Sequence, residues 1–416
     1  MTQASSTAPE GQSRWRSGPS TPARGSADRI RLSHAQTRAT MRFVLAFFAA
    51  AAVAALWADD RWLPLHLFLA GGVVLAISGV SVMLTVTWSA APAPPNNLVV
   101  AQRACIVVGA AGVTAGRTLD WPTSIIGAAG TLYLIGLFGL GWLLLSTIRR
   151  GVERRFDVAV AAYLSAVVAG LAGVGIGVSM AVHPASLTLR DAHVTANLLG
   201  LVGLTIGGSL PFFSATVVRA RMAKRATNTR LAVTFGWQFA MVTLTVGALA
   251  AESRGVAAAG FFGYALGIAA ILVWMPPPTR RQFEWAGPRL VALWAGGAWW
   301  IVTVVATALT AVDGRAVFRG AWLLALVVAA YGQIAWGSLA YLLPMLRGGG
   351  HKRLGEGFAT TKSWPGLVAV NVAGIGFAAS WEPVAAIALA VWVIDAAART
   401  VRVGTTRAVR PEEKST

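Results

Sequence analysis

Imidazole side chains are the groups in this sequence best suited to hold a metal ion or a haem. The chain has five histidines, and three of them, His66, His183 and His193, lie at the ends of long apolar stretches. Neutral imidazole is a common ligand of copper and of haem iron. We therefore take His66 and His193 as candidate haem or copper ligands, and His183 as a weaker candidate because it precedes Pro184 in a loop. The alternative is that all three are ordinary residues at helix ends.

The sequence offers little other chemistry. Cys105 is the single cysteine, so an internal disulfide and a cysteine metal cluster are excluded. The sequence contains no glycine-rich phosphate loop, HExxH motif, nucleophile elbow or carboxylate pair. We therefore expect no independent catalytic activity.

The composition indicates an integral membrane protein. Of the 416 residues, 56% are hydrophobic and only 12% are charged, and the mean hydropathy is +0.63. A soluble globule of this size needs a more highly charged surface. The net charge of +19 would suggest a nucleic-acid partner in a soluble protein. Here it comes almost entirely from arginine, in a composition typical of GC-rich bacterial genomes, and we expect lipid rather than nucleic acid as the partner.

The apolar stretches predict an all-α bundle of about twelve transmembrane helices, because a span needs roughly 20 apolar residues. Residues 1–40 are rich in Ser, Thr, Pro, Gly, Ala and Arg and are expected to form a disordered tail. The membrane domain follows at 41–400, and a second tail at 401–416. The expected spans lie at about 41–58, 64–90, 98–117, 123–147, 157–182, 193–218, 231–251, 256–275, 288–311, 320–345, 365–380 and 383–398.

The basic residues predict the orientation, because short cytoplasmic loops accumulate Lys and Arg. With the amino terminus inside, 28 of the 35 Lys and Arg residues fall in the tails or in the loops after spans four, six, eight and ten, and only six fall outside. We therefore expect a bacterial cytoplasmic (plasma) membrane protein with both termini in the cytoplasm. This orientation places His66, His183 and His193 toward the outer face.

Ionisable groups inside a membrane usually mark ion paths or ligand sites, because burying them is costly. No Asp or Glu lies in the middle of an expected span, which disfavours an ion-driven transporter. Arg103 and Asp395 lie near the cytoplasmic ends of spans three and twelve, where their side chains are expected to reach the interface. Clustered glycines, such as Gly200, Gly203 and Gly207, are expected to form packing faces between helices.

The spacing of three glycines indicates an internal repeat. Gly79, Gly208 and Gly337 are each separated by 129 residues and lie in spans two, six and ten. In the second and third of these spans the glycine begins the same Gly-Ser-Leu tripeptide. This period predicts three repeats of four helices, in agreement with twelve spans.

Three segments of the chain resemble actinobacterial multi-span membrane proteins that occur alone or fused to multicopper oxidase or copper nitrite reductase domains: LHLFLAGGVVLAISG, DAHVTANLLGLVGLTIGGSLPFF and GSLAYLLPMLRGGG. More distantly, twelve helices with outer histidines on spans two and six are similar to NnrS-type haem-copper membrane proteins and to the haem-copper oxidase core. The resemblance covers about Met41 to Thr400. It implies haem or copper at His66 and His193, and a periplasmic multicopper oxidase or nitrite reductase as partner.

The chain departs from both families at ligand positions. The oxidase pattern needs paired histidines on span seven and further histidines on span ten, where this chain has Trp237 with Gln238 and Tyr331 with Gln333. These substitutions exclude a working haem-copper oxidase. In relatives of the first family we expect a second histidine after the Trp-Ser pair that closes span two, where this chain has two alanines. No segment outside the spans is long enough to form a cupredoxin domain.

Three functions remain open. The first is a membrane component of copper or nitrogen-oxide metabolism that binds haem or copper through His66 and His193 near the outer face. The second is a membrane anchor or assembly partner of a periplasmic oxidase without chemistry of its own, which the missing ligands favour over an enzyme. The third is a twelve-span permease, although the loops lack the signature of major facilitator carriers.

Overall fold

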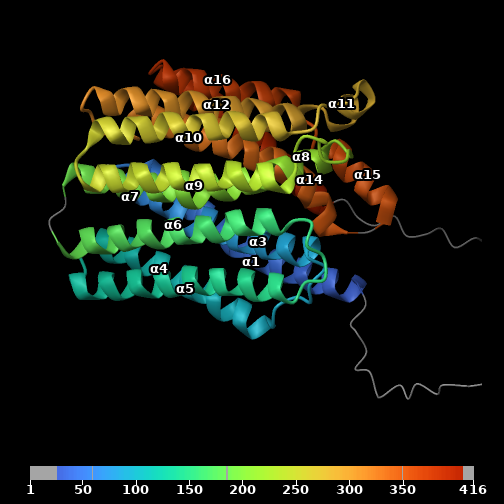
Figure 1. The fold of residues 1–416 in the computed structure, drawn as a ribbon, viewed down its shortest axis with the longest axis horizontal. Coiled ribbons are helices and arrows are strands. Elements are labelled where there is room, and N and C mark those ends of the chain that lie inside the picture. The colour runs from blue at the N-terminus through green and yellow to red at the C-terminus, as the bar shows by residue number, and fades with distance from the viewer. Residues whose placement is uncertain (1–25, 59, 184–185, 349, 406–416) are drawn as a thin grey trace, which may run out of the picture.

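A computed structural model describes residues 26–58, 60–183, 186–348 and 350–405. Over these ranges every regular element is a helix and no β-strand occurs. The long helices run side by side in alternating directions and form one bundle (Figure 1). The prediction of an all-α helical bundle is confirmed.

Within the described ranges, eleven helices are long and apolar enough to cross a membrane, three of them built from consecutive segments. They are α1 (Ser26–Trp57), α2–η1–α3 (Trp62–His66, Leu67–Val73, Val74–Trp88), α4 (Asn96–Thr118), α5 (Thr123–Arg149), α6 (Asp157–Val182), α7–η2–α8 (Leu187–Thr195, Ala196–Gly203, Leu204–Val217), α9 (Asn228–Ala250), α10 (Arg254–Trp274), α12 (Pro288–Val312), α13–η3–α14 (Gly320–Leu324, Ala325–Gly332, Gln333–Arg347) and α17 (Glu382–Thr405). Three shorter helices are α11 (Arg280–Ala286), α15 (Gly350–Thr360) and α16 (Trp364–Ala378).

The predicted span at 365–380 forms the short helix α16. It has 15 residues, or about 22 Å of helix at the usual rise, which is less than the roughly 30 Å of a bilayer core. α16 packs against α17 and against η3, so it is part of the bundle although it is too short to count as a span. The other eleven predicted spans match helices of sufficient length.

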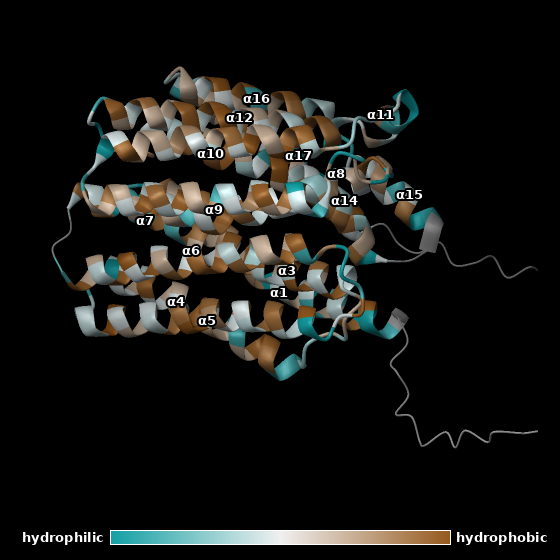
Figure 2. Ribbon diagram, in the orientation of Figure 1, coloured by the Kyte–Doolittle hydropathy of each residue, from teal (hydrophilic) through white to brown (hydrophobic). Residues whose placement is uncertain are grey.

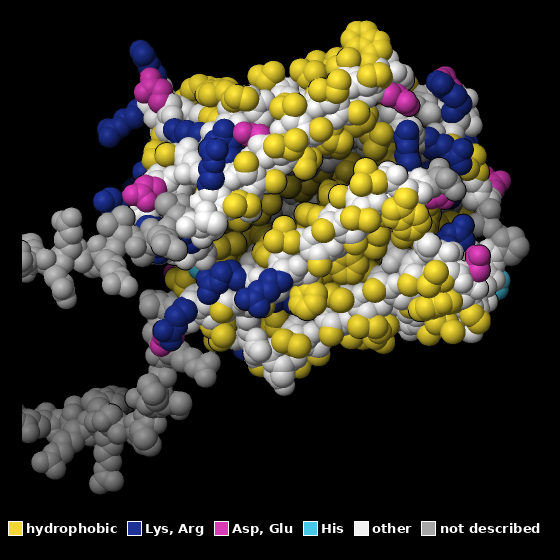
Figure 3. All heavy atoms as spheres, turned by 180° about the vertical axis from the view of Figure 1, so that it is seen from behind, with side chains coloured by type: hydrophobic (Ala, Val, Ile, Leu, Met, Phe, Trp, Pro, Cys, Tyr) yellow, Lys and Arg dark blue, Asp and Glu magenta, His cyan; other side chains and the backbone are white. Residues whose placement is uncertain are grey.

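Charged side chains gather at the two ends of the bundle and leave an apolar surface between them (Figures 2 and 3). Large apolar side chains on this surface are exposed, including Leu56 (87%), Leu266 (67%) and Ile387 (68%). Burying such a surface in lipid is favourable, whereas exposing it to water is not. The fold is therefore that of a polytopic membrane protein in contact with a lipid bilayer.

The two ends of the bundle differ in composition. α7, which carries His193, lies at one end, and α11 and α15 lie at the other (Figure 1). We call these the histidine end and the basic end. The basic end carries the arginine-rich segments that follow α5, α8, α10 and α14.

Three π-helical segments show the internal repeat directly. η1, η2 and η3 begin at Leu67, Ala196 and Ala325, each 129 residues after the one before. They lie in the second helix of each four-helix unit, as the glycine spacing predicted. Long π-helical segments are rare, so their return at one period supports the prediction of three four-helix repeats.

Tyrosine hydroxyls bind the backbone carbonyls of the π-helical segments. Tyr133 on α5 donates to the carbonyl of Ala70 at 2.7 Å, and Tyr264 on α10 donates to that of Leu199 at 2.8 Å. The two acceptors are 129 residues apart, so the contact repeats with the helices. A widened turn upsets the helical hydrogen-bond ladder, and in a membrane bundle the affected groups need partners from neighbouring helices.

The first helix begins earlier than predicted. α1 starts at Ser26 rather than near Met41, so the second part of the expected 1–40 tail is helical, and residues 1–25 lie outside the described residues. Polar side chains on this part of α1 face the bundle: Ser33, Gln36, Thr37 and Thr40 are each at most 4% exposed. Gln36 donates to the carbonyl of Pro94 at 3.0 Å. The polar composition therefore reflects a buried face rather than a solvated tail.

The two charged residues near span ends are bound within the protein. Arg103 is only 8% exposed and donates to the carbonyl of Gln36 at 2.6 Å, so its side chain is held by α1; that it reaches the interface stays a prediction. Asp395 accepts from Arg399 at 2.9 Å and 3.0 Å.

α17 continues to Thr405, beyond the predicted end of the membrane domain at 400, and residues 406–416 are outside the described ranges.

Replacing Tyr264 with Phe should destabilise the bundle. The change leaves the Leu199 carbonyl unpaired in a buried position, at a cost of about 1–3 kcal/mol. We expect a lower thermal unfolding midpoint in detergent. Tyr341→Phe is the control, because Tyr341 packs against Phe358 and its hydroxyl has no hydrogen bond in the described structure. Equal midpoints for the two variants would contradict the proposed role of the Tyr264 hydroxyl.

Candidate functional site

The structure brings the two predicted site residues together at the histidine end. The rings of His66, at the end of α2, and His193, on α7, have centroids 6.4 Å apart and planes inclined by only 11°. The two residues are 127 positions apart in sequence and belong to the first and second repeats. Both side chains are partly buried.

His66 is held by a stack of side chains. Its ring lies on the Trp62 indole one turn earlier, with centroids 4.2 Å apart, and its Nδ1 lies 2.8 Å from the Trp62 carbonyl oxygen. The Arg117 guanidinium, in the last turn of α4, lies 5.3 Å from the Trp62 ring centre. Such cation–π contact is favourable and orders the indole against which His66 rests.

His193 is held by the neighbouring helix α6. Its Nδ1 lies 2.7 Å from the carbonyl oxygen of Gly173. One turn further on, Gly177 faces the ring so closely that an added Cβ would lie 2.7 Å from the His193 Cε1. The imidazole fits here because Gly177 lacks a side chain, and an added Cβ at Gly173 would meet Asn197 and Ala196 instead, so both glycines let the two helices approach.

The hydrogen bonds determine which nitrogen of each ring is free. A carbonyl oxygen can only accept, so Nδ1 of both histidines must carry the proton and donate it. In a neutral imidazole this leaves the lone pair on Nε2. Metal-binding histidines are typically arranged in this way, with the second ring nitrogen donating to a carbonyl or carboxylate. The pair therefore has the tautomer that leaves Nε2 free to bind a metal.

The separation of the rings is also compatible with one bridging ion. Two metal–nitrogen bonds of about 2 Å, with roughly 1 Å from each nitrogen to its ring centre, place the centroids on the order of 6 Å apart when both Nε2 atoms face the ion. His183 is exposed at the end of α6, outside this stack. Over the described residues no group of three or more His, Cys, Asp or Glu could hold a metal ion, so a site here would rest on two imidazoles.

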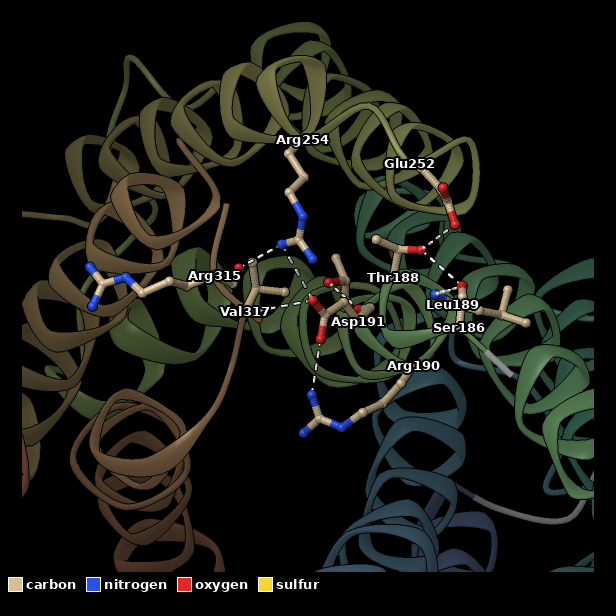
Figure 4. Close-up of polar contacts among 10 residues, drawn as sticks. Ser186, Thr188, Leu189, Arg190, Asp191, Glu252, Arg254, Arg315 and Val317 are labelled. Carbon is tan, nitrogen blue, oxygen red and sulfur yellow. Dashed lines mark hydrogen bonds and ion pairs between the residues drawn. The ribbon is translucent and has the colours of Figure 1, made fainter. Parts of the chain in front are cut away.

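A buried carboxylate positions α7 and with it His193 (Figure 4). Asp191 is fully buried and accepts from Arg190 Nη1 at 2.9 Å and from the backbone N–H of Val317 at 3.1 Å, and Arg254 Nη1 lies 3.8 Å away. Val317 lies in the loop between α12 and α13, and Arg254 is the first residue of α10. Asp191 thus links the second repeat to the third.

A second set of polar contacts holds the start of α7. Ser186 caps the helix, because its Oγ accepts from the backbone N–H of Leu189 at 3.2 Å. Thr188 contacts Ser186 Oγ at 2.9 Å and donates to Glu252 Oε1 at 3.4 Å (Figure 4). The start of the histidine-bearing helix is therefore tied to the loop between α9 and α10.

Of the four side chains at the positions that lack oxidase-type histidines, three are buried and Trp237 is 45% exposed. Gln238 and Gln333 are at most 1% exposed, and neither amide has a hydrogen-bond partner in the described structure. Tyr331 donates to the carbonyl of Leu198 on η2 at 2.9 Å. Trp237 donates to the carbonyl of Gly263 at 2.7 Å. Two of these four side chains therefore bind helix backbone.

Several residues of this site carry no direct signal in the sequence. Trp62 precedes His66 by one helical turn, which is the one local cue. Asp191 belongs to no sequence motif, although it lies two residues before His193. Gly173 and Gly177 were two among 45 glycines, and only the packing of α6 on α7 shows their role.

Comparison with known proteins does not assign the chain to a family. No protein-family model matches the chain, and no curated protein matches it. The class of the protein therefore rests on its fold, a polytopic helical membrane bundle, and on the side chains described above.

Replacing Asp191 with Asn should loosen the histidine end. The variant keeps the shape of the side chain but removes the charge that Arg190 and Arg254 face, at a cost of about 1–3 kcal/mol. We expect a lower thermal unfolding midpoint and faster proteolysis of the α12–α13 loop. Asp157→Asn is the control, because its ion pair with Arg154 is exposed and such pairs contribute little. An unchanged midpoint in Asp191→Asn would contradict the linking role.

Proposed function

We propose that this protein is a membrane component of copper or nitrogen-oxide metabolism that binds one copper ion between His66 and His193. The observation that carries the proposal is the paired arrangement of the two imidazoles, 6.4 Å apart, each with Nδ1 against a backbone carbonyl. Imidazole nitrogen is a suitable donor for copper, and monovalent copper accepts two ligands in a line. When bound, the ion would supply redox or ligand-exchange chemistry.

Copper is favoured over haem by the packing around the rings. A porphyrin needs a broad planar slot beside its axial ligands, whereas the His193 ring lies directly against Gly177 of α6. The His66 ring is likewise covered by Trp62 on one side. A single ion needs far less space beside the two rings than a porphyrin does.

The orientation is part of the proposal. The arginine-rich segments at the basic end favour a cytoplasmic location for that end. The histidine end then faces the outside of a bacterial plasma membrane. An ion held by only two protein ligands there has free coordination positions, which suits exchange with a periplasmic partner such as a multicopper oxidase or nitrite reductase.

A second candidate is a membrane anchor or assembly partner of such an oxidase without a metal of its own. It is favoured by the lack of a third ligand near the pair in the described residues. In that case the two histidines serve packing.

Copper binding can be tested on the protein purified in detergent. We expect about one copper per chain by mass spectrometry after exposure to monovalent copper, and loss of this copper in His66→Ala and in His193→Ala. His183→Ala is the control at the same end and should retain it. A folded wild-type protein that binds no copper would overturn the proposal and leave the anchor function. A Soret band that depends on the same two histidines would instead assign haem.

The glycines of α6 provide a finer test of the geometry. Gly177→Ala should weaken copper binding at least about tenfold, because the methyl group meets the His193 ring and must displace it. Gly175→Ala lies two residues away on the same helix, and its added Cβ meets nothing within 4 Å. Equal copper affinity in the two variants would show that the ring position observed here is not the one that binds the ion.

A further inference from the structure

A cluster of three cations surrounds one indole at the basic end. The guanidinium of Arg219 lies 3.4 Å from the ring centre of Trp285, that of Arg289 lies 5.6 Å away, and the Lys362 ammonium lies 5.7 Å away. The four side chains come from the segment after α8, from α11, from the start of α12 and from the segment before α16. We call them the Trp285 cluster.

Backbone contacts hold two of the cations in place. Arg289 donates through Nη2 to the carbonyl of Trp285 at 3.1 Å and through Nε to that of Ala286 at 3.3 Å. Lys362 donates to the carbonyl of Glu284 at 3.0 Å. These carbonyls end α11, and cations are favourable at the end of a helix. Carbonyl dipoles, however, do not neutralise three full charges.

The cluster has no compensating carboxylate. Among the described residues, Arg219, Arg289 and Lys362 form no ion pair, and the nearest carboxylate in sequence, Glu284, binds Arg280 at 3.0 Å. Arg289 is only 1% exposed, and its Nη1 has no hydrogen-bond partner. Burial lowers the pKa of Lys362, and the charge of Arg289 lowers it further. An anion placed here would relieve this repulsion.

An open groove lies beside the cluster and has an apolar wall. Its volume is about 250 Å³, and Lys362 lines it together with Phe283, Glu284, Gly287, Pro288 and Trp364. Trp364 is 51% exposed and begins α16. The outer faces of α16 and α17 next to it are apolar and exposed, for example Val368 at 59% and Ile394 at 68%. Of the cluster, only Lys362 lines the groove, and it thus connects the cationic site to the lipid-facing surface.

We propose that the Trp285 cluster binds the phosphodiester head group of an anionic phospholipid. Arginine and lysine are the usual partners of phosphate oxygens, and basic pockets between helices on the cytoplasmic side of a membrane bind anionic head groups. The groove favours a lipid over free phosphate, because the aromatic and proline side chains provide a surface for the glycerol and the first acyl carbons. The site is remote from the histidine pair and does not depend on it.

The test uses full-length protein in detergent and short-chain dioctanoyl phosphatidylglycerol, with binding followed by native mass spectrometry. Wild type should bind one molecule, and Arg219→Gln/Lys362→Gln should bind it at least about tenfold more weakly. This double variant spares buried Arg289, so the bundle should remain folded. Arg150→Gln/Arg154→Gln removes the same charge from the exposed segment after α5 and should leave the affinity unchanged.

Two further ligands separate the possible sources of the phosphate group. Dioctanoyl phosphatidylcholine carries the same chains without net charge and should bind more weakly than phosphatidylglycerol. Inorganic phosphate should compete only poorly with the anionic lipid. Equal binding of the two lipids, equal binding by the two double variants, or displacement of the lipid by millimolar phosphate would each overturn the proposal.

Discussion

The need to pair every backbone polar group inside a membrane governs this structure. Helices meet that need by themselves, but each second helix of the three repeats contains a π-helical segment that upsets the regular ladder. Hydroxyls from other helices then donate to the carbonyls. Tyr133 donates to a carbonyl of η1, and Tyr264 and Tyr331 donate to carbonyls of η2. The central helices are therefore joined to their neighbours by directed bonds as well as by apolar packing.

The three repeats share a scaffold but differ in the side chains that precede the π-segment. The first repeat has His66 directly before η1, the second has His193 three residues before η2, and the third has only apolar residues in α13. The histidine pair consequently lies between the first two repeats. Asp191 connects the second repeat to the third at the same end. The histidine end thus combines the His66–His193 pair, which could bind a ligand, with the Asp191 contacts, which only fix position.

The sequence predicted the architecture well because its signals are local. Apolar stretches mark the spans, and the 129-residue glycine period marked the repeats that the π-segments later showed. It also placed His66 and His193 at one end, although their role as ligands stays a prediction. The sequence could not show that the Gly173 carbonyl binds the His193 imidazole or that Gly177 leaves room for it, because both depend on how α6 meets α7. The start of α1 was missed since Ser33, Gln36 and Thr37 have the composition of a tail, and only their packing against the bundle explains them.

The early start of α1 has a consequence for biogenesis. Arg38 on this helix donates to the carbonyl of Leu346, near the end of α14 and 308 residues later, at 2.8 Å. The first helix therefore completes its contacts only after the tenth span has been synthesised and inserted. Until then Arg38 lacks this partner, whereas Gln36 and Thr37 can already bind the carbonyls of Pro94 and Gly79. A ribosome stalled before α14 would therefore leave an incomplete bundle that quality-control proteases could recognise.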